Sequence, residues 1–274
     1  VFGGWTSASR KAMLPVVEGA NGLLFYPVQY EGLEASENIY YTGATTNQQI
    51  IPAMDFLKSE GVETLFLAGS DYVFPRTANK IIKQYAKELG IEIVGEEYVP
   101  LDSDDWTTQV AKIAAAKPDF VFNTINGSSN VGFIKAYYEA GLGPDNSPII
   151  SVSIAEEEAP AMGEDVTGQF AAWNYFQSVE SPENTKFIEA FKAEYGDDRP
   201  TSRPDFHQPR GGKLNQRFPN RRPRHGELFG QFRLVEAQTG SVNPGHDAFL
   251  KRFFQSFRNF RLVFVIAHDL NETT

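Results

Sequence analysis

The sequence predicts an α/β fold with parallel sheets, and three features of its first 204 residues indicate this. Apolar runs of strand length alternate with segments whose apolar residues recur at helical spacing. Several runs are almost continuously apolar, as expected of strands covered on both faces. Glycine follows three of the helical segments, and a Lys-Pro pair follows a fourth. Such alternation is typical of a parallel sheet with helices on both sides.

Seven strands are expected from short apolar runs. They are LLFY (23–26), NIYYTG (38–43), TLFLAG (64–69), IEIVGEEYV (91–99), DFVFNT (119–124), PIISVS (148–153) and FAAWNYF (170–176). The alternation is unbroken over residues 50–176, so this stretch is predicted to form the most complete unit.

Four helices are expected from apolar side chains three and four residues apart. The clearest starts near Pro75, which suits a first turn, and stops before Gly90. The other three run from Trp106 to Lys117, from Val131 to Gly141 and from Phe187 to Gly196. A further helix start is expected in VFGGWTSASRKAM (1–13), where a serine suits the N-cap.

Composition changes at about Pro204. Residues 1–204 hold 14 Lys and Arg against 29 Asp and Glu, a net charge of −15, whereas residues 205–274 hold 11 against 6, a net charge of +5. All four histidines also follow the change. Residues 205–246 have no strand or helix period and are rich in Arg, Pro and Gly, which predicts disorder. The Phe-rich stretch 247–268 fits either a basic amphipathic helix or a segment that does not belong to the domain.

The organised region lacks the groups that most enzymes and metal sites need. The chain has no cysteine, and residues 1–204 have no histidine, so nucleophilic triads and zinc sites have no support there. No phosphate-binding glycine motif occurs. An acidic body is also a poor partner for nucleic acid. We therefore expect a binding protein, not an enzyme, with no metal and no cofactor.

Polar and aromatic residues follow five of the predicted strand ends or turns. In a parallel sheet these positions gather at one edge, where small ligands bind. Aromatic rings, hydroxyls and amides together suit a small planar polar solute. Each cluster also fits an ordinary turn or a core aromatic. The clusters are 5–7, 26–30, 70–74, 123–127 and 151–156.

Seven segments resemble a known family. They are GGWTSASRKAMLPVVE, GLLFYPVQYEGLE, TNQQIIPA, GSDYVFPRTANKIIK, NGSSNVGF, SIAEEE and AAWNYFQSVESPEN, which lie in order across residues 1–203. In sequence and spacing they resemble solute-binding proteins of urea-type ABC transporters, in the branched-chain amino acid and amide group of type I periplasmic binding proteins.

The resemblance implies two α/β lobes that close on a ligand. It assigns residues 1–46 to the remainder of lobe 1, residues 47–176 to lobe 2 and residues 177–204 to the return into lobe 1. It also implies an N-terminal truncation and an atypical C-terminal region, because 205–274 departs from the family pattern and reads as a non-homologous, disordered tail. The ligand-facing positions that it implies are Trp5, Thr6, Ser7, Tyr26, Gln29, Tyr72 and Phe74, with Asn126 and the Ser153–Glu156 turn, including Glu156, as weaker matches.

The function implied by the resemblance is delivery of urea or a short-chain amide to ABC permease subunits. The location implied is the periplasm or cell surface, with a signal peptide upstream of this chain. The alternative is a cytoplasmic amide sensor that regulates an amidase operon, since one such regulator shares the S-x-x-R-K-A and G-S-D-Y strings. Urea offers one carbonyl acceptor and four N–H donors. Thr6 and Ser7 are expected to hold the carbonyl, and Gln29, tyrosine hydroxyls or Glu156 to accept the N–H groups.

Overall fold

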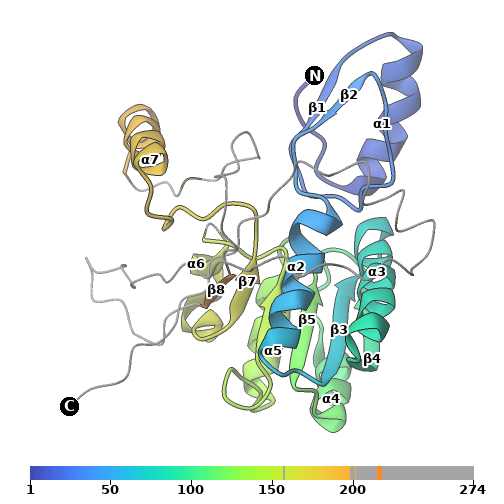
Figure 1. Cartoon of the computed structure of the whole chain (residues 1–274), viewed down its shortest axis with the longest axis vertical. Helices are drawn as coiled ribbons and strands as arrows, with labels where there is room; N and C mark the ends of the chain where they lie inside the picture. The colour runs from blue at the N-terminus through green and yellow to red at the C-terminus, as the bar shows by residue number, and fades with distance from the viewer. Residues whose placement is uncertain (157, 198–200, 202–214, 218–274) are drawn as a thin grey trace.

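The computed structural model describes residues 1–156, 158–197, 201 and 215–217. Within them helices and parallel strands alternate, which confirms the predicted fold class (Figure 1). The elements are α1 (Ser7–Gly19), β1 (Leu24–Tyr26), β2 (Ile39–Tyr41), α2 (Thr46–Ser59), β3 (Thr64–Ser70), α3 (Val73–Leu89), β4 (Glu92–Val99), α4 (Thr107–Ala116), β5 (Phe120–Thr124), α5 (Ser129–Glu139), β6 (Ile149–Ser151), α6 (Ala159–Met162), a 3-10 helix η1 (Gly163–Val166), β7 (Phe170–Ala172), α7 (Pro182–Tyr195) and β8 (Asn215–Arg217).

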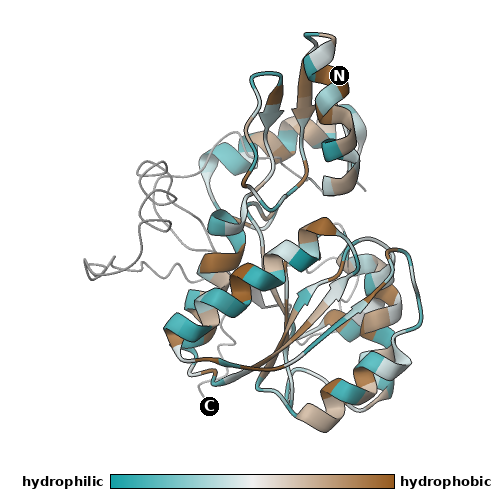
Figure 2. Cartoon of the chain, turned by 90° about the vertical axis from the view of Figure 1, so that its right-hand side faces the viewer, coloured by the Kyte–Doolittle hydropathy of each residue, from teal (hydrophilic) through white to brown (hydrophobic). Residues whose placement is uncertain are grey.

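A six-stranded sheet forms the larger part, here called the six-stranded unit with its helices α2 to α6. Its strand order is β4-β3-β5-β6-β7-β8, and all its pairs are parallel except β7 with β8. The chain runs outward from β3 to β4 and then back across β3 to β5, so right-handed connections place α3 and α4 on opposite faces. Helix α2 packs beside α3, and α5 packs beside α4. Figure 2 shows helices on both sides of this sheet.

Strand β8 lies inside the segment for which the sequence predicted disorder. Its three residues pair with β7 in antiparallel register, with Ala171 opposite Gln216. The disorder expected for the segment as a whole stays a prediction. The rest of 205–274, including the Phe-rich stretch, lies outside the described residues.

Strands β1 and β2 form a separate two-stranded parallel sheet with α1 beside it, here called the β1–β2 unit. Leu24 and Tyr26 of β1 are fully buried. On the sheet's other side the rings of Phe2, Phe25 and Tyr40 stack in a row, with centroids 4.5 and 5.1 Å apart. Phe2 and Tyr40 are exposed.

The described part of the chain has two hydrophobic clusters. The large one fills the six-stranded unit and contains fully buried side chains such as Leu67, Ile82 and Phe122. The small one holds Leu24, Tyr26, Tyr30 and Ile39 of the β1–β2 unit. The predicted lobes and their boundaries at residues 46, 176 and 204 stay predictions.

Helix ends follow the local sequence closely. Gly90 adopts φ +68° and ends α3, and Lys117 in the left-handed region ends α4 just before Pro118. The N-cap of α1 is Thr6, where the sequence suggested a serine. Thr6 Oγ1 accepts from the Ser9 N–H at 3.0 Å, while Ser9 Oγ accepts from the Thr6 N–H at 3.2 Å. This reciprocal capping box fixes the first turn of α1.

Among the described helices, none combines the length and the apolar character that crossing a membrane requires.

Candidate functional site

A cavity of about 270 Å³ lies between the β1–β2 unit and the six-stranded unit. Most of its lining comes from segments that directly follow strands, at the sheet edge where open α/β folds bind ligands. The residues that line it are Trp5, Pro27, Val28, Gln29, Gly43, Ala44, Tyr72, Asn126, Gly127, Ser153, Glu158, Trp173 and Asn174.

Aromatic rings supply much of this lining. Trp5 precedes α1, Tyr72 precedes α3, and Trp173 follows β7. Trp5 is 51% exposed, and its ring lies against Gly127. Gly127 has φ +68°, and a Cβ there would lie 3.0 Å from the Trp5 ring, so glycine permits this contact between the two units.

A hydrogen-bonded series of side chains crosses the cavity wall. Tyr72 Oη donates to Asn126 Oδ1 at 2.7 Å. Asn126 Nδ2 donates to Ser153 Oγ, and Gln29 Nε2 donates to the same Ser153 Oγ at 3.0 Å. Gln29 follows β1, whereas the other three residues belong to the six-stranded unit. The series therefore joins the two units beside the cavity.

The wall of the β1–β2 unit depends on a close backbone approach at Gly43. A Cβ placed on Gly43 would lie 2.0 Å from the Val28 carbonyl oxygen and 2.7 Å from the Gln29 backbone nitrogen. Such distances exclude any side chain at Gly43. The two lining segments, 27–29 and 43–44, can lie together only because residue 43 is glycine.

The cavity has little charge. Among the described residues that line it, Glu158 is the only acidic one, and none is Arg, Lys or His. Glu158 Oε2 accepts from the Ala155 N–H at 2.8 Å. Burial, followed by the nearby Tyr26 and Glu31, raises the pKa of Tyr72 well above its ordinary value. Tyr72 is therefore a neutral phenol at physiological pH.

Four of the nine residues predicted for the site line the cavity: Trp5, Gln29, Tyr72 and Asn126. They come from four different segments of the chain, and their role in binding a ligand stays a prediction. The remaining five, Thr6, Ser7, Tyr26, Phe74 and Glu156, are not among the lining residues.

Thr6 and Ser7 use their side-chain oxygens within the β1–β2 unit. Thr6 Oγ1 caps α1. Ser7 is 1% exposed, and its Oγ accepts from Arg10 Nη1 at 3.1 Å. Neither residue lines the cavity, and the predicted contact of these two hydroxyls with a ligand carbonyl stays a prediction.

Tyr26, Phe74 and Glu156 lie outside the cavity lining. Tyr26 is fully buried and donates from its hydroxyl to the Trp5 carbonyl at 3.3 Å. Phe74 is buried, with its ring centroid 6.5 Å from that of Tyr72. Glu156 accepts from the backbone N–H groups of residues 177 and 178.

The sequence does not point to Trp173 and Asn174, because the predicted strand 170–176 includes both residues. The strand β7 ends at Ala172, so both residues are strand-end residues that the same rule would have selected. Ser153 appeared only within the weaker Ser153–Glu156 turn. Gly43 carried no signal, because its role depends on a neighbour that is distant in sequence.

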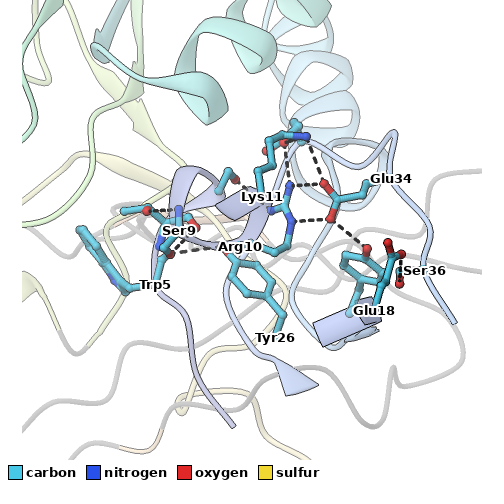
Figure 3. Close-up of polar contacts among 12 residues, drawn as sticks. Trp5, Ser9, Arg10, Lys11, Glu18, Tyr26, Glu34 and Ser36 are labelled. Carbon is cyan, nitrogen blue, oxygen red and sulfur yellow. Dashed lines mark hydrogen bonds and ion pairs between the residues drawn. The ribbon is translucent and has the colours of Figure 1, made fainter. Parts of the chain in front are cut away.

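A buried ionic cluster around Arg10 lies in the β1–β2 unit, beside Tyr26 (Figure 3). Arg10, whose side chain is fully buried, contacts Glu31 and Glu34, each at 2.8 Å. Its guanidinium carbon lies 5.0 Å from the centroid of the Tyr26 ring and 4.7 Å from that of Tyr30. Cation–π contacts of this kind add to the stabilisation that the ion pairs give to Arg10.

These contacts shift the pKa values of the groups around Arg10. Burial tends to raise the pKa of Glu34, but hydrogen bonds from Arg10, Lys11 and Tyr41 outweigh it and lower the pKa to about 2. Burial raises the pKa of Tyr30 to about 12. The carboxylate of Glu34 is thus charged, and Tyr30 is neutral, over the whole physiological range.

No group of three or more His, Cys, Asp or Glu side chains is arranged to hold a metal ion in the part of the chain that the structure describes.

The described residues form a two-sheet α/β protein with a cavity between its two units. The family model described as "Periplasmic binding protein domain" matches residues 1–208. The chain belongs to this periplasmic binding protein family.

The chain is similar to the Leu/Ile/Val-binding protein homolog 6 of Brucella melitensis, with 28% identity over 164 residues, 59% of this chain and 42% of that protein. Its fold is similar to a solute-binding protein of an ABC transporter from R. palustris, solved with 4-hydroxybenzoate, with a TM-score of 0.66 and 23% identity over 72% of this chain and 55% of that one. A branched-chain amino acid ABC transporter protein from Thermus thermophilus, solved with valine, has a TM-score of 0.60 and 14% identity over 71% of this chain and 52% of that one.

This chain thus spans about two-fifths of the curated relative from Brucella melitensis and about half of the solved structures. At these identities the structural likeness shows the fold alone.

Proposed function

We propose that this protein is a solute receptor that binds a small, uncharged polar molecule in the cavity between the β1–β2 unit and the six-stranded unit. One observation carries the proposal. A cavity of about 270 Å³ is lined from both units by aromatic rings and neutral polar side chains, with one carboxylate at its wall. A solute in that position contacts both units at once, which gives it a means of holding them together.

Urea or a short-chain amide fits this lining best. The rings of Trp5, Tyr72 and Trp173 offer flat apolar faces for a planar molecule. Gln29 and Asn126 offer amide groups that match the edges of another amide. Strong discrimination among such small molecules requires that each of their polar groups be paired.

The charge of the cavity lining favours an amide over 4-hydroxybenzoate and valine, the ligands of the two similar structures. The described lining contains no Arg, Lys or His to balance a carboxylate, and it contains Glu158, which repels one. Burying an unpaired anion costs several kcal/mol. A neutral solute avoids that cost, so the proposed ligand differs from the benzoate and the amino acid in the solved relatives.

Membership of the periplasmic binding protein family supports a role in transport without catalysis. We accordingly place the receptor in the periplasm or at the cell surface, where it would hand its solute to the permease subunits of an ABC importer. The same lining would serve an amide sensor, from which permease-dependent uptake of labelled solute distinguishes it.

Isothermal titration calorimetry tests the proposal directly. Purified chain is titrated with urea, acetamide, leucine and 4-hydroxybenzoate under one buffer condition. Ligands of four heavy atoms gain at most about −6 kcal/mol, so we expect dissociation constants of about tens of micromolar or weaker for urea and acetamide. Leucine and 4-hydroxybenzoate should bind at least about tenfold more weakly. Preference for either acid over both amides would contradict the proposal.

A further inference from the structure

Ser153 stands at the centre of the hydrogen bonds that join the two units beside the cavity. Its Oγ accepts from Gln29 Nε2 at 3.0 Å and from Asn126 Nδ2. A serine hydroxyl has two acceptor lone pairs and one hydrogen to donate. Both lone pairs of Ser153 Oγ are therefore used, and only its hydrogen is left to form a further hydrogen bond.

In the structure both amides turn their nitrogens towards Ser153 Oγ. Gln29 Nε2 also faces the Val152 carbonyl oxygen at 3.5 Å, which requires that the nitrogen of the Gln29 amide, and not its oxygen, lies on this side. Asn126 Oδ1 accepts from the Tyr72 hydroxyl, so the Asn126 nitrogen is left for Ser153. The two amides thus both donate to Ser153.

The Ser153 hydrogen has no acceptor among the described protein groups. Ser153 is 8% exposed, and it lines the cavity. Leaving a largely buried hydroxyl hydrogen unpaired is unfavourable, so the site favours an occupant that accepts from it. Tyr72 uses its own hydrogen on Asn126 and presents only lone pairs to such an occupant.

We infer that the Ser153 hydroxyl is the donor that selects a carbonyl oxygen in the cavity, with Gln29 and Asn126 as positioning residues that aim it. This inference rests on the proposed function. It moves the carbonyl contact from Thr6 and Ser7, where the sequence had placed it, to the six-stranded unit. A ligand with a carbonyl oxygen at that position accepts a hydrogen bond from Ser153. A planar analogue that carries only N–H donors there places a second hydrogen against the Ser153 hydrogen, which is repulsive.

Acetamide and acetamidine form the matched pair of probes, because the amidinium has the shape of acetamide with an N–H group in place of its oxygen. Calorimetry measures both against the wild-type chain, Ser153→Ala and the control Ser59→Ala, which removes an exposed hydroxyl that bonds to the Phe56 carbonyl at 2.7 Å. We expect Ser153→Ala to weaken acetamide binding at least about tenfold and acetamidine binding less than about threefold. Ser59→Ala should change neither.

A second variant tests the direction of the bond while keeping the hydroxyl. In Asn126→Asp the new carboxylate still accepts from Tyr72, but towards Ser153 it accepts where the amide donated. The Ser153 hydrogen then turns to the carboxylate and away from the ligand. Acetamide binding should fall about as far as in Ser153→Ala, without a matching fall for acetamidine. Thermal unfolding followed by circular dichroism verifies that each variant is folded.

The possible results distinguish the role inferred for Ser153 from the proposed function. Acetamide binding that survives unchanged in folded Ser153→Ala overturns the inference and leaves the proposed function standing. Equal losses for acetamide and acetamidine also overturn it, because Ser153 would then only shape the cavity. A wild-type chain that binds neither urea nor acetamide refutes the proposed function, and the inference falls with it.

Discussion

Arg10 and Glu34 form a two-point ion pair inside the β1–β2 unit, with Nε 2.8 Å from Oε1 and Nη2 3.2 Å from Oε2. The pair joins α1, which begins just after Trp5, to the segment that follows β1 and contains Gln29. Two residues of the cavity wall are therefore held in place by charges that lie outside the cavity.

Removing the cation of this pair should destabilise the protein strongly. Arg10→Met leaves two buried carboxylates without their main partner, a change that costs about 3–5 kcal/mol. The melting temperature measured by circular dichroism should fall by about 10 °C. Lys11→Met is the matched control, because Lys11 is 44% exposed and an exposed ion pair contributes at most about 1 kcal/mol. Equal losses in the two variants would show that burial of Arg10 is not what matters.

The same cluster predicts how stability depends on pH. The pKa of Glu34 is about 2 in the folded chain and near 4.5 when unperturbed, so the unfolded chain binds a proton first as pH falls. The stability that Glu34 contributes is present above pH 4.5 and is lost as pH falls from there towards 2. Between pH 6 and pH 3 the wild type should lose more melting temperature than Glu34→Gln. Parallel curves for the two proteins would contradict this.

Much of the fold is readable from the sequence because each signal is local. Each of the seven predicted strands overlaps one of β1 to β7, and Gly90 and Lys117 end their helices as their positions indicated. The site is only partly readable. Sequence identifies residues at strand ends, but it does not show that Ser7 is buried beside Arg10 and outside the cavity lining. Such pairings depend on neighbours that only the folded chain brings together.

Gly43→Ala should disrupt the cavity wall without any change in polarity. The added Cβ would overlap the Val28 carbonyl oxygen, so the segment 27–29 has to move. We expect a loss of at least about 2–3 kcal/mol of stability, measured by thermal unfolding, and at least about tenfold weaker acetamide binding. The control is Gly19→Ala, where nothing lies within 4 Å of the new methyl group and φ is not positive. If both variants bind acetamide like the wild type, the close approach is not required.

Tyr72 should contribute to affinity through its ring and its hydroxyl. Tyr72→Ala removes both and should weaken urea or acetamide binding by about 1–3 kcal/mol, measured by calorimetry. Tyr72→Phe keeps the ring but breaks the bond to Asn126, so a smaller loss of about 1 kcal/mol is expected. Tyr85→Phe serves as control, since its hydroxyl donates to Asp55 at 2.6 Å and Tyr85 is not among the lining residues. Wild-type affinity in folded Tyr72→Ala would show that Tyr72 is only a packing residue.

The central claim is that a small carbonyl solute binds between the β1–β2 unit and the six-stranded unit. A crystal structure of the protein grown with acetamide tests it most directly. Acetamide should occupy the cavity, with its oxygen within hydrogen-bond distance of Ser153 Oγ and its plane against the ring of Trp5, Tyr72 or Trp173. An empty cavity at saturating acetamide, or acetamide bound with its amide nitrogen towards Ser153, would show that the protein does not bind a carbonyl solute in this way.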